Sequence, residues 1–486
     1  MSFSENAKAL IRKESYINGI WVEADNDSEF EVINPANQEI IAKIANLGGN
    51  ETEKAVQAAE EALKTWKHTL AKDRANLLRE WAKEIRLHTD ALAEILTIEQ
   101  GKPLLEAKSE ILYGLSFIDW FAEETRRTYG DIVPTHKKDA RIMLTRQPIG
   151  VVGAITPWNH PNAMIARKVS PALAAGCTVV LKPSEETPLS AIALTILAEK
   201  AGFPKGVFNL VVGDNASQIG TVLTQHPVVK KISFTGSTAV GKKLMAQVSS
   251  TVKKVSLELG GNAPFIVFES ADLDKAVQGA IDCKFRNAGQ TCVSANRIYV
   301  HDAIYERFVD KFTKKVNAMK VGNGMDEGVK IGPLIYPKAV DKVAGHVKDA
   351  IDKGATLLCG GTKPQAVGNF YQPTVLTRLT QTMAIAKEET FGPIAGLFKF
   401  SNEDEVIKWA NDTLYGLAAY VYTRDFAQIF RTTEALEYGM VAVNEPYLSA
   451  EAAPFGGIKE SGIGREGSRY GLKEFTEIKY TLIGGL

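Results

Sequence analysis

The stretch Gly150-Val-Val-Gly-Ala-Ile155, followed by a helical segment from Asn162 and then by Thr178-Val-Val-Leu181, decides the fold class of this chain. Each apolar, β-branched run is short enough to be a buried strand, and residues with helical spacing separate it from the next. The series continues with a helix over 187–201, a strand over 207–212, a helix to about residue 224 and a strand over 231–235. This alternation predicts a parallel, doubly wound α/β sheet.

A second unit of the same class is predicted further along the chain. The alternation restarts at Pro264-Phe-Ile-Val-Phe268 and continues to about Asn444. Upstream, residues 16–35 alternate like short strands, and residues 51–96 have the composition and spacing of helices. Because 486 residues exceed what one hydrophobic core usually serves, we expect two α/β domains in series.

The composition argues against several classes of partner. Lys and Arg together number 57, as do Asp and Glu, and a net charge of zero argues against nucleic acid. No run approaches the roughly 18 apolar residues of a membrane span, and residues 1–18 lack the apolar segment of an export signal. The four cysteines are far apart and form no C-x-x-C pair, so we expect reduced thiols in the cytoplasm and no metal site.

Three residues are candidates for catalysis on local sequence alone. Cys292 lies in a polar, glycine-containing turn, whereas Cys177 and Cys359 fit the buried structural role that is usual for free cysteine. Glu258 stands between two leucines, and apolar surroundings would raise its pKa and suit a general base. Asn159 follows a strand in a proline-bounded loop and could donate to an oxyanion. The alternatives are a structural cysteine, a solvent-facing strand glutamate and a simple turn asparagine.

Two segments are candidates for binding a cofactor phosphate or ribose. The usual dinucleotide fingerprint G-x-G-x-x-G is not found at the strand-to-helix turns. Phe234-Thr-Gly-Ser-Thr-Ala-Val-Gly241 has its glycines at another spacing, but it could still direct a helix N-terminus at a phosphate. Leu181-Lys-Pro-Ser-Glu185 lies at the carboxyl end of the preceding predicted strand, where open α/β sheets bind ligands.

Seven segments, in this order, resemble the aldehyde dehydrogenase superfamily over essentially the whole chain. They are Pro157-Trp-Asn159, Lys182-Pro-Ser-Glu185, Phe234-Thr-Gly-Ser237, Leu257-Glu-Leu-Gly-Gly-Asn262, Gly289-Gln-Thr-Cys292, Glu388-Glu-Thr-Phe-Gly-Pro393 and Pro454-Phe-Gly-Gly457. The resemblance implies a Rossmann-type NAD-binding domain, an α/β catalytic domain and a small oligomerisation sheet.

The resemblance also implies roles for the three catalytic candidates. Cys292 would attack the aldehyde carbon to form a thiohemiacetal, with Asn159 and the Cys292 backbone N–H as the oxyanion hole. After hydride transfer, Glu258 would activate water to hydrolyse the resulting thioester.

The implied cofactor is NAD or NADP, bound by a variant of the Rossmann turn. The implied cofactor-binding residues are Thr156, Pro157, Trp158, Lys182, Ser184, Glu185, Phe234, Gly236, Ser237, Leu259, Glu389 and Phe391. A carboxylate at Glu185 would accept a hydrogen bond from a ribose 2′-OH and repel a 2′-phosphate, so we expect NAD to be preferred and NADP to be possible.

Within the superfamily, the chain is most similar to succinate-semialdehyde dehydrogenases. The resemblance implies that Arg167 and Arg286 bind the distal carboxylate of the substrate and that Ser449 assists them. Glutarate semialdehyde and 2-oxoglutarate semialdehyde remain alternative substrates. Other classes of function also remain: a cofactor-free thiol acyl-transferase or esterase, and a non-catalytic protein that retains the fold.

The resemblance gives expected domain limits and an expected assembly. Residues 1–127 and 147–258 would form the dinucleotide-binding domain, and 259–460 the catalytic domain. Residues 128–146 and 461–486 would form the oligomerisation segments of a homodimer or homotetramer, because an apolar edge strand needs a partner.

Overall fold

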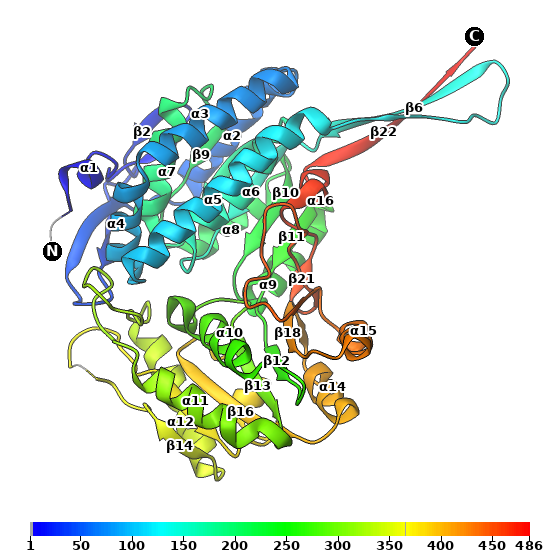
Figure 1. Cartoon of the computed structure of the whole chain (residues 1–486). Coiled ribbons are helices and arrows are strands. Elements are labelled where there is room, and N and C mark those ends of the chain that lie inside the picture. The colour runs from blue at the N-terminus through cyan, green and yellow to red at the C-terminus, as the bar shows by residue number, and fades with distance from the viewer. Residues whose placement is uncertain (1–2, 365) are drawn as a thin grey trace.

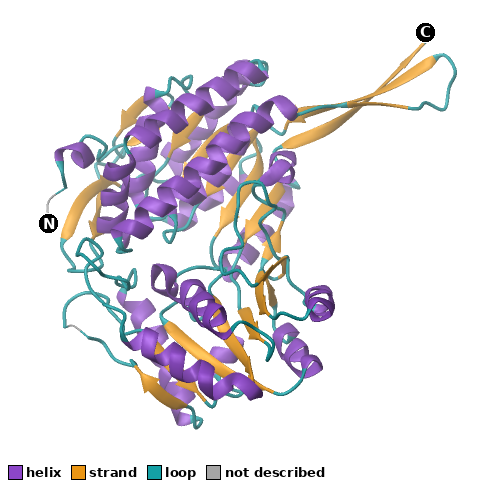
Figure 2. Cartoon of the chain, viewed as in Figure 1, coloured by secondary structure: helices purple, strands orange, loops and turns teal. Residues whose placement is uncertain are grey.

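Two large sheets with helices packed against them make up the body of the molecule (Figures 1 and 2). The computed structural model describes residues 3–364 and 366–486, so the expected domain limit at residue 1 lies outside the described residues. The two sheets correspond to the two α/β units predicted from the sequence, and the fold class is confirmed.

The first sheet has the strand order β2-β1-β9-β8-β7-β10-β11-β21, in which the strands from β9 to β11 are parallel. These central strands are largely buried and rich in Val and Ile, as expected for a sheet covered on both faces. The bounds are β1 (Ser15–Ile17), β2 (Ile20–Val22), β7 (Val151–Ile155), β8 (Thr178–Lys182), β9 (Phe208–Leu210), β10 (Val229–Thr235), β11 (Lys254–Glu258) and β21 (Gly462–Ile463).

The second sheet has the order β14-β15-β16-β13-β12-β18-β19, and only its edge strand β14 is antiparallel among the described residues. It contains the strand predicted at residues 264–268. The bounds are β12 (Ala263–Val267), β13 (Ala295–His301), β14 (Thr356–Cys359), β15 (Thr374–Thr377), β16 (Ile394–Phe400), β18 (Ala418–Tyr422) and β19 (Met440–Val443).

A three-stranded antiparallel sheet extends away from the body and carries the C-terminus (Figure 1). It joins β5 (Asp131–Val133), β6 (Ala140–Pro148) and β22 (Thr476–Gly484). The strand β21, which falls in the expected oligomerisation segment 461–486, instead pairs with β11 in the first sheet. Two further antiparallel pairs are β3 (Glu29–Ile33) with β4 (Ile40–Ala45) and β17 (Tyr415–Gly416) with β20 (Ile458–Lys459).

The helices that the sequence pattern predicts are present, with ends that differ by a few residues, and the structure adds others that were not predicted individually, such as α5. The predicted helix 187–201 is α7, and the predicted helical region 51–96 is divided into α2, α3 and α4. Within the described residues, no helix is both long and apolar enough to cross a membrane. The bounds are α1 (Glu5–Lys8), α2 (Gly49–Trp66), α3 (Ala71–Leu87), α4 (Thr89–Gln100), α5 (Leu104–Glu124), α6 (Pro161–Ala175), α7 (Pro188–Lys200), α8 (Ala216–Gln225), α9 (Thr238–Val248), α10 (Leu273–Phe285), α11 (Tyr305–Asn317), α12 (Pro337–Asp352), α13 (Ala384–Lys387), α14 (Glu403–Asn411), α15 (Phe426–Ala435) and α16 (Ser468–Lys473).

Helix α6 has clear start and stop signals and is buried along its whole length. Pro161 occupies its first turn, where a missing N–H costs nothing, and Gly176 ends it with a left-handed φ of +92°. It lies beside α5 (Figure 1), so side chains of both helices face one interior region. That region becomes one wall of the candidate site.

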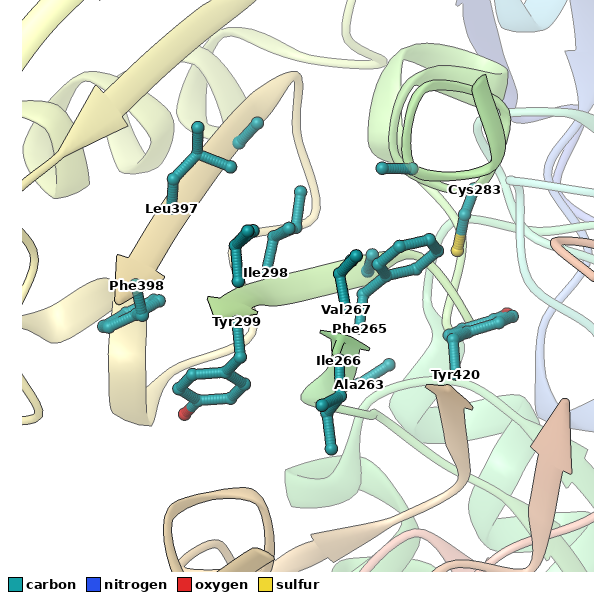
Figure 3. Packing of buried hydrophobic residues seen from close by; sticks show 14 of the residues in the cluster. Ala263, Phe265, Ile266, Val267, Cys283, Ile298, Tyr299, Leu397, Phe398 and Tyr420 are labelled. Atoms are coloured by element: carbon teal, nitrogen blue, oxygen red, sulfur yellow. The ribbon is translucent and has the colours of Figure 1, made fainter. Parts of the chain in front are cut away.

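Aromatic rings form the centre of the second sheet, next to the candidate nucleophile. The ring of Phe265 stacks on Tyr422 at 4.8 Å and on Tyr420 at 5.8 Å between centroids. Figure 3 shows Tyr420 beside Phe265, with Cys283 above it. The Tyr420 hydroxyl donates to the main-chain oxygen of Val293 at 2.8 Å. The packed core therefore holds the residue that directly follows Cys292.

Candidate active site

Two cavities meet at Cys292. The first, of about 830 Å³, is lined by Arg167, Arg286 and Ser449 among others, and we call it the arginine cavity. The second, of about 920 Å³, is lined by Phe391 among others, and we call it the Phe391 cavity. Cys292 lines both, as does Met164. A reactive group at Cys292 could therefore contact ligands in either space.

The chain reaches Cys292 through a strained turn after α10. Asn287, Ala288 and Gly289 follow one another with φ of +51°, +54° and +76°, a left-handed conformation that is costly for the two non-glycine residues. A Cβ at Gly289 would lie 2.2 Å from the main-chain oxygen of Gly392, so only glycine fits there. The main-chain N–H of Asn287 donates to the Glu106 carboxylate at 2.7 Å and helps to hold the turn.

The Cys292 thiol requires a base before it can react. Burial raises its pKa to about 12, and the nearby Glu389 carboxylate adds to the increase. Because the thiolate is the nucleophilic form, a neighbouring group must accept the proton. Cys177 is fully buried, and burial raises its pKa to about 11, which fits the structural role expected of it.

Asn159 lies in the loop between β7 and α6 and lines the Phe391 cavity with Cys292. Its side-chain amide donates one hydrogen bond to the main-chain oxygen of Gln290 at 3.0 Å. Its own main-chain oxygen accepts from Lys102 Nζ at 2.8 Å and from Asn287 Nδ2 at 3.0 Å. The second amide proton has no protein acceptor among the described residues and can donate to a ligand oxygen.

Glu258 is the last residue of β11 and is 3% exposed, so it is not the solvent-facing strand residue of the alternative interpretation. Burial and the negative charge of Glu466 raise its pKa, while Arg167 and Lys168 oppose the increase. Its Oε2 has no hydrogen-bond partner among the described residues. A buried carboxyl with a raised pKa and a free oxygen is suited to accept a proton near neutral pH.

The two arginines of the arginine cavity differ in their surroundings. Arg167 forms an ion pair with Glu466 at 2.7 Å and lies over the Phe455 ring at 4.0 Å. Arg286 forms no ion pair with any described residue, and its guanidinium carbon lies 5.4 Å from the centroid of the Tyr447 ring. Arg286 is therefore the arginine whose charge is left for an anionic ligand.

The Phe391 cavity has the features that a dinucleotide needs. Helix α9 begins at it with Ser237 as N-cap, and a helix N-terminus stabilises a phosphate. The Phe234 ring would lie 2.4 Å from a Cβ at Gly236, so only glycine permits this turn. The buried hydroxyl of Thr235, which lines this cavity, has no partner among the described residues and is left for a ligand. Burial raises the pKa of Glu389 to about 7.

The structure brings together most, but not all, of the predicted cofactor residues. Those that line the Phe391 cavity are Pro157, Trp158, Gly236, Ser237, Leu259, Glu389 and Phe391. Thr156, Lys182, Ser184, Glu185 and Phe234 do not line it; they lie in or directly after β7, β8 and β10, the strands that lead to this edge. Lys182 Nζ is 2.9 Å from the Glu185 carboxylate.

Several residues of the site had no role predicted from the sequence. Tyr113 of α5 contacts the Ser449 hydroxyl, and Glu466 pairs with both Arg167 and Lys168. Lys102 and Glu110 line the arginine cavity from α5 and the segment before it. No local signal marked Tyr113 or Glu110, because they lie on a helix whose apolar spacing dominates its sequence. Among the described residues, no group of three or more His, Cys, Asp or Glu could hold a metal ion.

Comparison with known proteins gives a consistent family. The model of the aldehyde dehydrogenase family matches residues 21–481. The chain is 55% identical to an NADP-dependent succinate-semialdehyde dehydrogenase of Escherichia coli over 99% of both chains. It is 55% identical to a 3-sulfolactaldehyde dehydrogenase of Pseudomonas putida over 98% of both chains. It is 54% identical to a glutarate-semialdehyde dehydrogenase of Pseudomonas aeruginosa over 98% of this chain and 99% of that one.

A solved structure agrees with these sequence matches. The crystal structure of a succinate-semialdehyde dehydrogenase from Burkholderia pseudomallei superimposes with a TM-score of 0.98 at 53% identity, and the match covers all of both chains.

Proposed function

This chain belongs to the aldehyde dehydrogenase family and is an NAD(P)-dependent oxidoreductase that acts on aldehydes, and we propose that its substrate is a small aldehyde with a carboxylate at its other end. Succinate semialdehyde is the first choice. The observation that carries the proposal is the arginine cavity, where Cys292 shares a space with Arg286, a cation that has no ion-pair partner among the described residues. An arginine fork binds a carboxylate in a way that it cannot bind a neutral aldehyde tail.

The proposed reaction begins at Cys292 and uses the groups described above. Its thiolate adds to the aldehyde carbon, and the oxyanion that forms is stabilised by the Asn159 amide and the Cys292 backbone N–H. NAD(P)+, held by residues of the Phe391 cavity, would supply the hydride acceptor that converts this adduct into a thioester. Glu258 then takes a proton from water as the water attacks the thioester, and the acid leaves as the Cys292 thiolate is released.

Other carboxylate-bearing semialdehydes remain candidate substrates. The three relatives described above are named for succinate semialdehyde, glutarate semialdehyde and 3-sulfolactaldehyde. All three compounds carry an anionic group, which Arg286 could bind. Glutarate semialdehyde and 2-oxoglutarate semialdehyde are therefore kept as alternatives. The family membership speaks against a cofactor-free acyl-transferase, and a non-catalytic role is disfavoured because Cys292, Glu258 and Asn159 are all present.

Glu185 and Lys182 bear on whether the enzyme prefers NAD or NADP. Its carboxylate favours NAD in principle, but the Escherichia coli relative is named as an NADP enzyme, so the preference for NAD has no support from the relatives. Lys182 offers a route to NADP, because its ammonium pairs with Glu185 at 2.9 Å and could pair with a 2′-phosphate instead. A cytoplasmic location and a homodimer or homotetramer belong to the same proposal. Exposed apolar side chains on β22, such as Ile478 and Leu482, support the assembly.

A panel of substrates tests the proposal directly. The rate of NAD(P)+ reduction is measured by absorbance. We expect it to be fast with succinate and glutarate semialdehydes and slow with butanal, because butanal lacks the carboxylate. Running each substrate with NAD and with NADP measures the effect of Glu185. Butanal as the best substrate would contradict the carboxylate proposal but leave the family chemistry in place. No reduction with any aldehyde would favour the non-catalytic alternative.

Replacing Arg286 by methionine is expected to raise KM for succinate semialdehyde by about 10- to 100-fold, because a hydrogen bond to a charged group contributes about 1.5–3 kcal/mol. The effect on butanal should be much smaller. Arg286→Lys keeps the positive charge but loses the two-pronged hydrogen bonding of the guanidinium, so its KM for succinate semialdehyde should lie between those of the wild type and Arg286→Met. Arg126→Met, a change at an exposed position outside both cavities, is the control. Equal effects of Arg286→Met on both substrates would contradict a carboxylate-binding role.

A further inference from the structure

Three polar side chains are packed together at the loop that carries Asn159: Lys102, Glu110 and His160, which is the last residue of this loop. Lys102 Nζ contacts the Glu110 carboxylate, the main-chain oxygen of Asn159 at 2.8 Å and His160 Nδ1 at 3.2 Å. The other Glu110 oxygen accepts from the main-chain N–H of Asn162 at 3.0 Å, in the first turn of α6. This cluster ties the loop that carries Asn159 to α5.

The hydrogen-bond partners in this cluster favour one tautomer of His160. An ammonium group has three protons, and Lys102 meets three acceptors, one of which is His160 Nδ1. A proton on Nδ1 would go to Glu110 at 3.1 Å, but Nδ1 would then face the Lys102 ammonium as a second donor at 3.2 Å, and one Lys102 proton would lose its acceptor. An acceptor at Nδ1 uses all three Lys102 protons and places its lone pair 3.1 Å from a Glu110 oxygen. We assign the second tautomer, with the ring proton on Nε2, because it leaves no proton of the buried ammonium without an acceptor.

His160 is neutral under ordinary conditions. Burial lowers its pKa to about 4, and the Lys102 charge adds to the decrease, while Glu110 opposes it. A neutral ring with an acceptor at Nδ1 carries one donor, the Nε2–H.

The Nε2–H of His160 makes at most a weak hydrogen bond within the described protein. His160 Nε2 lies 3.5 Å from the Thr291 hydroxyl oxygen, which is long for a hydrogen bond. His160 and Thr291 both line the arginine cavity. His160 directly follows Asn159 and Thr291 directly precedes Cys292, so this donor lies near the place where the aldehyde carbon must be held.

We propose that His160 Nε2–H donates a hydrogen bond to an oxygen substituent on the carbon next to the aldehyde, so that the enzyme favours hydroxylated aldehydes over their unsubstituted counterparts. The inference rests on the proposed function in that it takes the arginine cavity as the substrate site. Thr291 gives the donor an alternative partner when the substrate has no hydroxyl, so the discrimination is modest. We expect a preference of about fivefold to tenfold in kcat/KM, the size of one hydrogen bond between neutral groups.

Matched substrates and two variants test this inference. The first pair is succinate semialdehyde and the same acid with a hydroxyl on the carbon next to the aldehyde. The second pair is butanal and its derivative with the same hydroxyl. In the wild type, the hydroxylated member of each pair should have the higher kcat/KM. In His160→Phe, which keeps a flat ring but has no N–H, this ratio should fall to about one. His160→Gln, whose side-chain amide can donate, should restore part of it.

The ratio within a pair separates a specificity role from a structural one. A structural role of His160 would lower kcat/KM for both members of a pair equally, and that result would overturn the inference. A wild type without preference in either pair would overturn it as well, whatever the variants do. Because the butanal pair has no carboxylate, it reports on His160 even if the proposal for Arg286 fails. Equal and high kcat/KM for succinate semialdehyde and its hydroxylated counterpart would overturn this inference and leave the proposed function in place.

Discussion

Replacing Cys292 by alanine is expected to lower kcat for aldehyde oxidation by at least about 10⁴-fold, the size of effect seen when a covalent nucleophile is removed. Cys292 is the cysteine that lines both cavities, whereas Cys177 and Cys283 are buried in the cores and Cys359 lies in β14. No other thiol among the described residues is placed to replace it. The rate is measured as formation of reduced cofactor with the best substrate of the panel.

Cofactor binding should survive the Cys292→Ala change and serves as the control for folding. Trp158 lines the Phe391 cavity, so quenching of tryptophan fluorescence can report NAD(P)+ binding. The matched variant is Cys359→Ala, at a half-buried thiol outside both cavities, and it should retain most of the activity. Appreciable turnover by Cys292→Ala would contradict the thioester mechanism, because the remaining groups offer no covalent route.

The order of strands and helices could be predicted because each segment carries its own periodicity. The run Gly150–Ile155 became β7 and the helix predicted over 187–201 became α7 with nearly the same ends. The pairing of β21 with β11 could not be predicted, because two residues, Gly462 and Ile463, have no period to read. Their place depends on Gly462, where a Cβ would lie 1.8 Å from the main-chain oxygen of Leu257. A contact of that kind exists only in three dimensions.

The candidate site also has a part that the sequence predicts and a part that it does not. Cys292, Glu258 and Asn159 lie in short motifs that resemble a known family, so their roles were predicted from the sequence. The ion-pair partners and protonation of the side chains around them could not be predicted from the sequence. Arg167 forms an ion pair with Glu466, whereas Arg286 has no such partner among the described residues. The pair joins residues almost 300 positions apart in the sequence, so it could not be predicted from local motifs. The tautomer of His160 likewise depends on Lys102, whose neighbours in the sequence give no sign of it.

The pH dependence of the reaction should carry the signature of Glu258. Burial and the charge of Glu466 raise its pKa above the ordinary value of a carboxyl group. Below that raised pKa the group is protonated and cannot accept a proton from water, so the rate of thioester hydrolysis should rise with pH through this pKa and level off above it. A carboxyl with an ordinary pKa would have reached the plateau in more acidic solution.

Glu258→Gln is expected to slow thioester hydrolysis by about 10²- to 10⁴-fold, which is the usual contribution of a general base. The amide nearly preserves the shape of the buried side chain, and a neutral group removes the repulsion from Glu466, so folding should be retained. With hydrolysis slowed, the variant should accumulate the thioester on Cys292, which mass spectrometry of the acid-quenched enzyme would detect. The rising limb of the pH profile should disappear as well.

The control for Glu258→Gln is the same change at Glu434, an exposed residue of α15. It should leave both the rate and the pH profile as they are. An unchanged steady-state rate in Glu258→Gln would remove Glu258 as the base for hydrolysis. A lowered rate without accumulated thioester would assign Glu258 to the earlier step, deprotonation of Cys292, whose raised pKa also calls for a base. Both buried groups have raised pKa values, so Glu258 is a candidate base for either proton transfer, and the presence or absence of the trapped thioester identifies the step that depends on it.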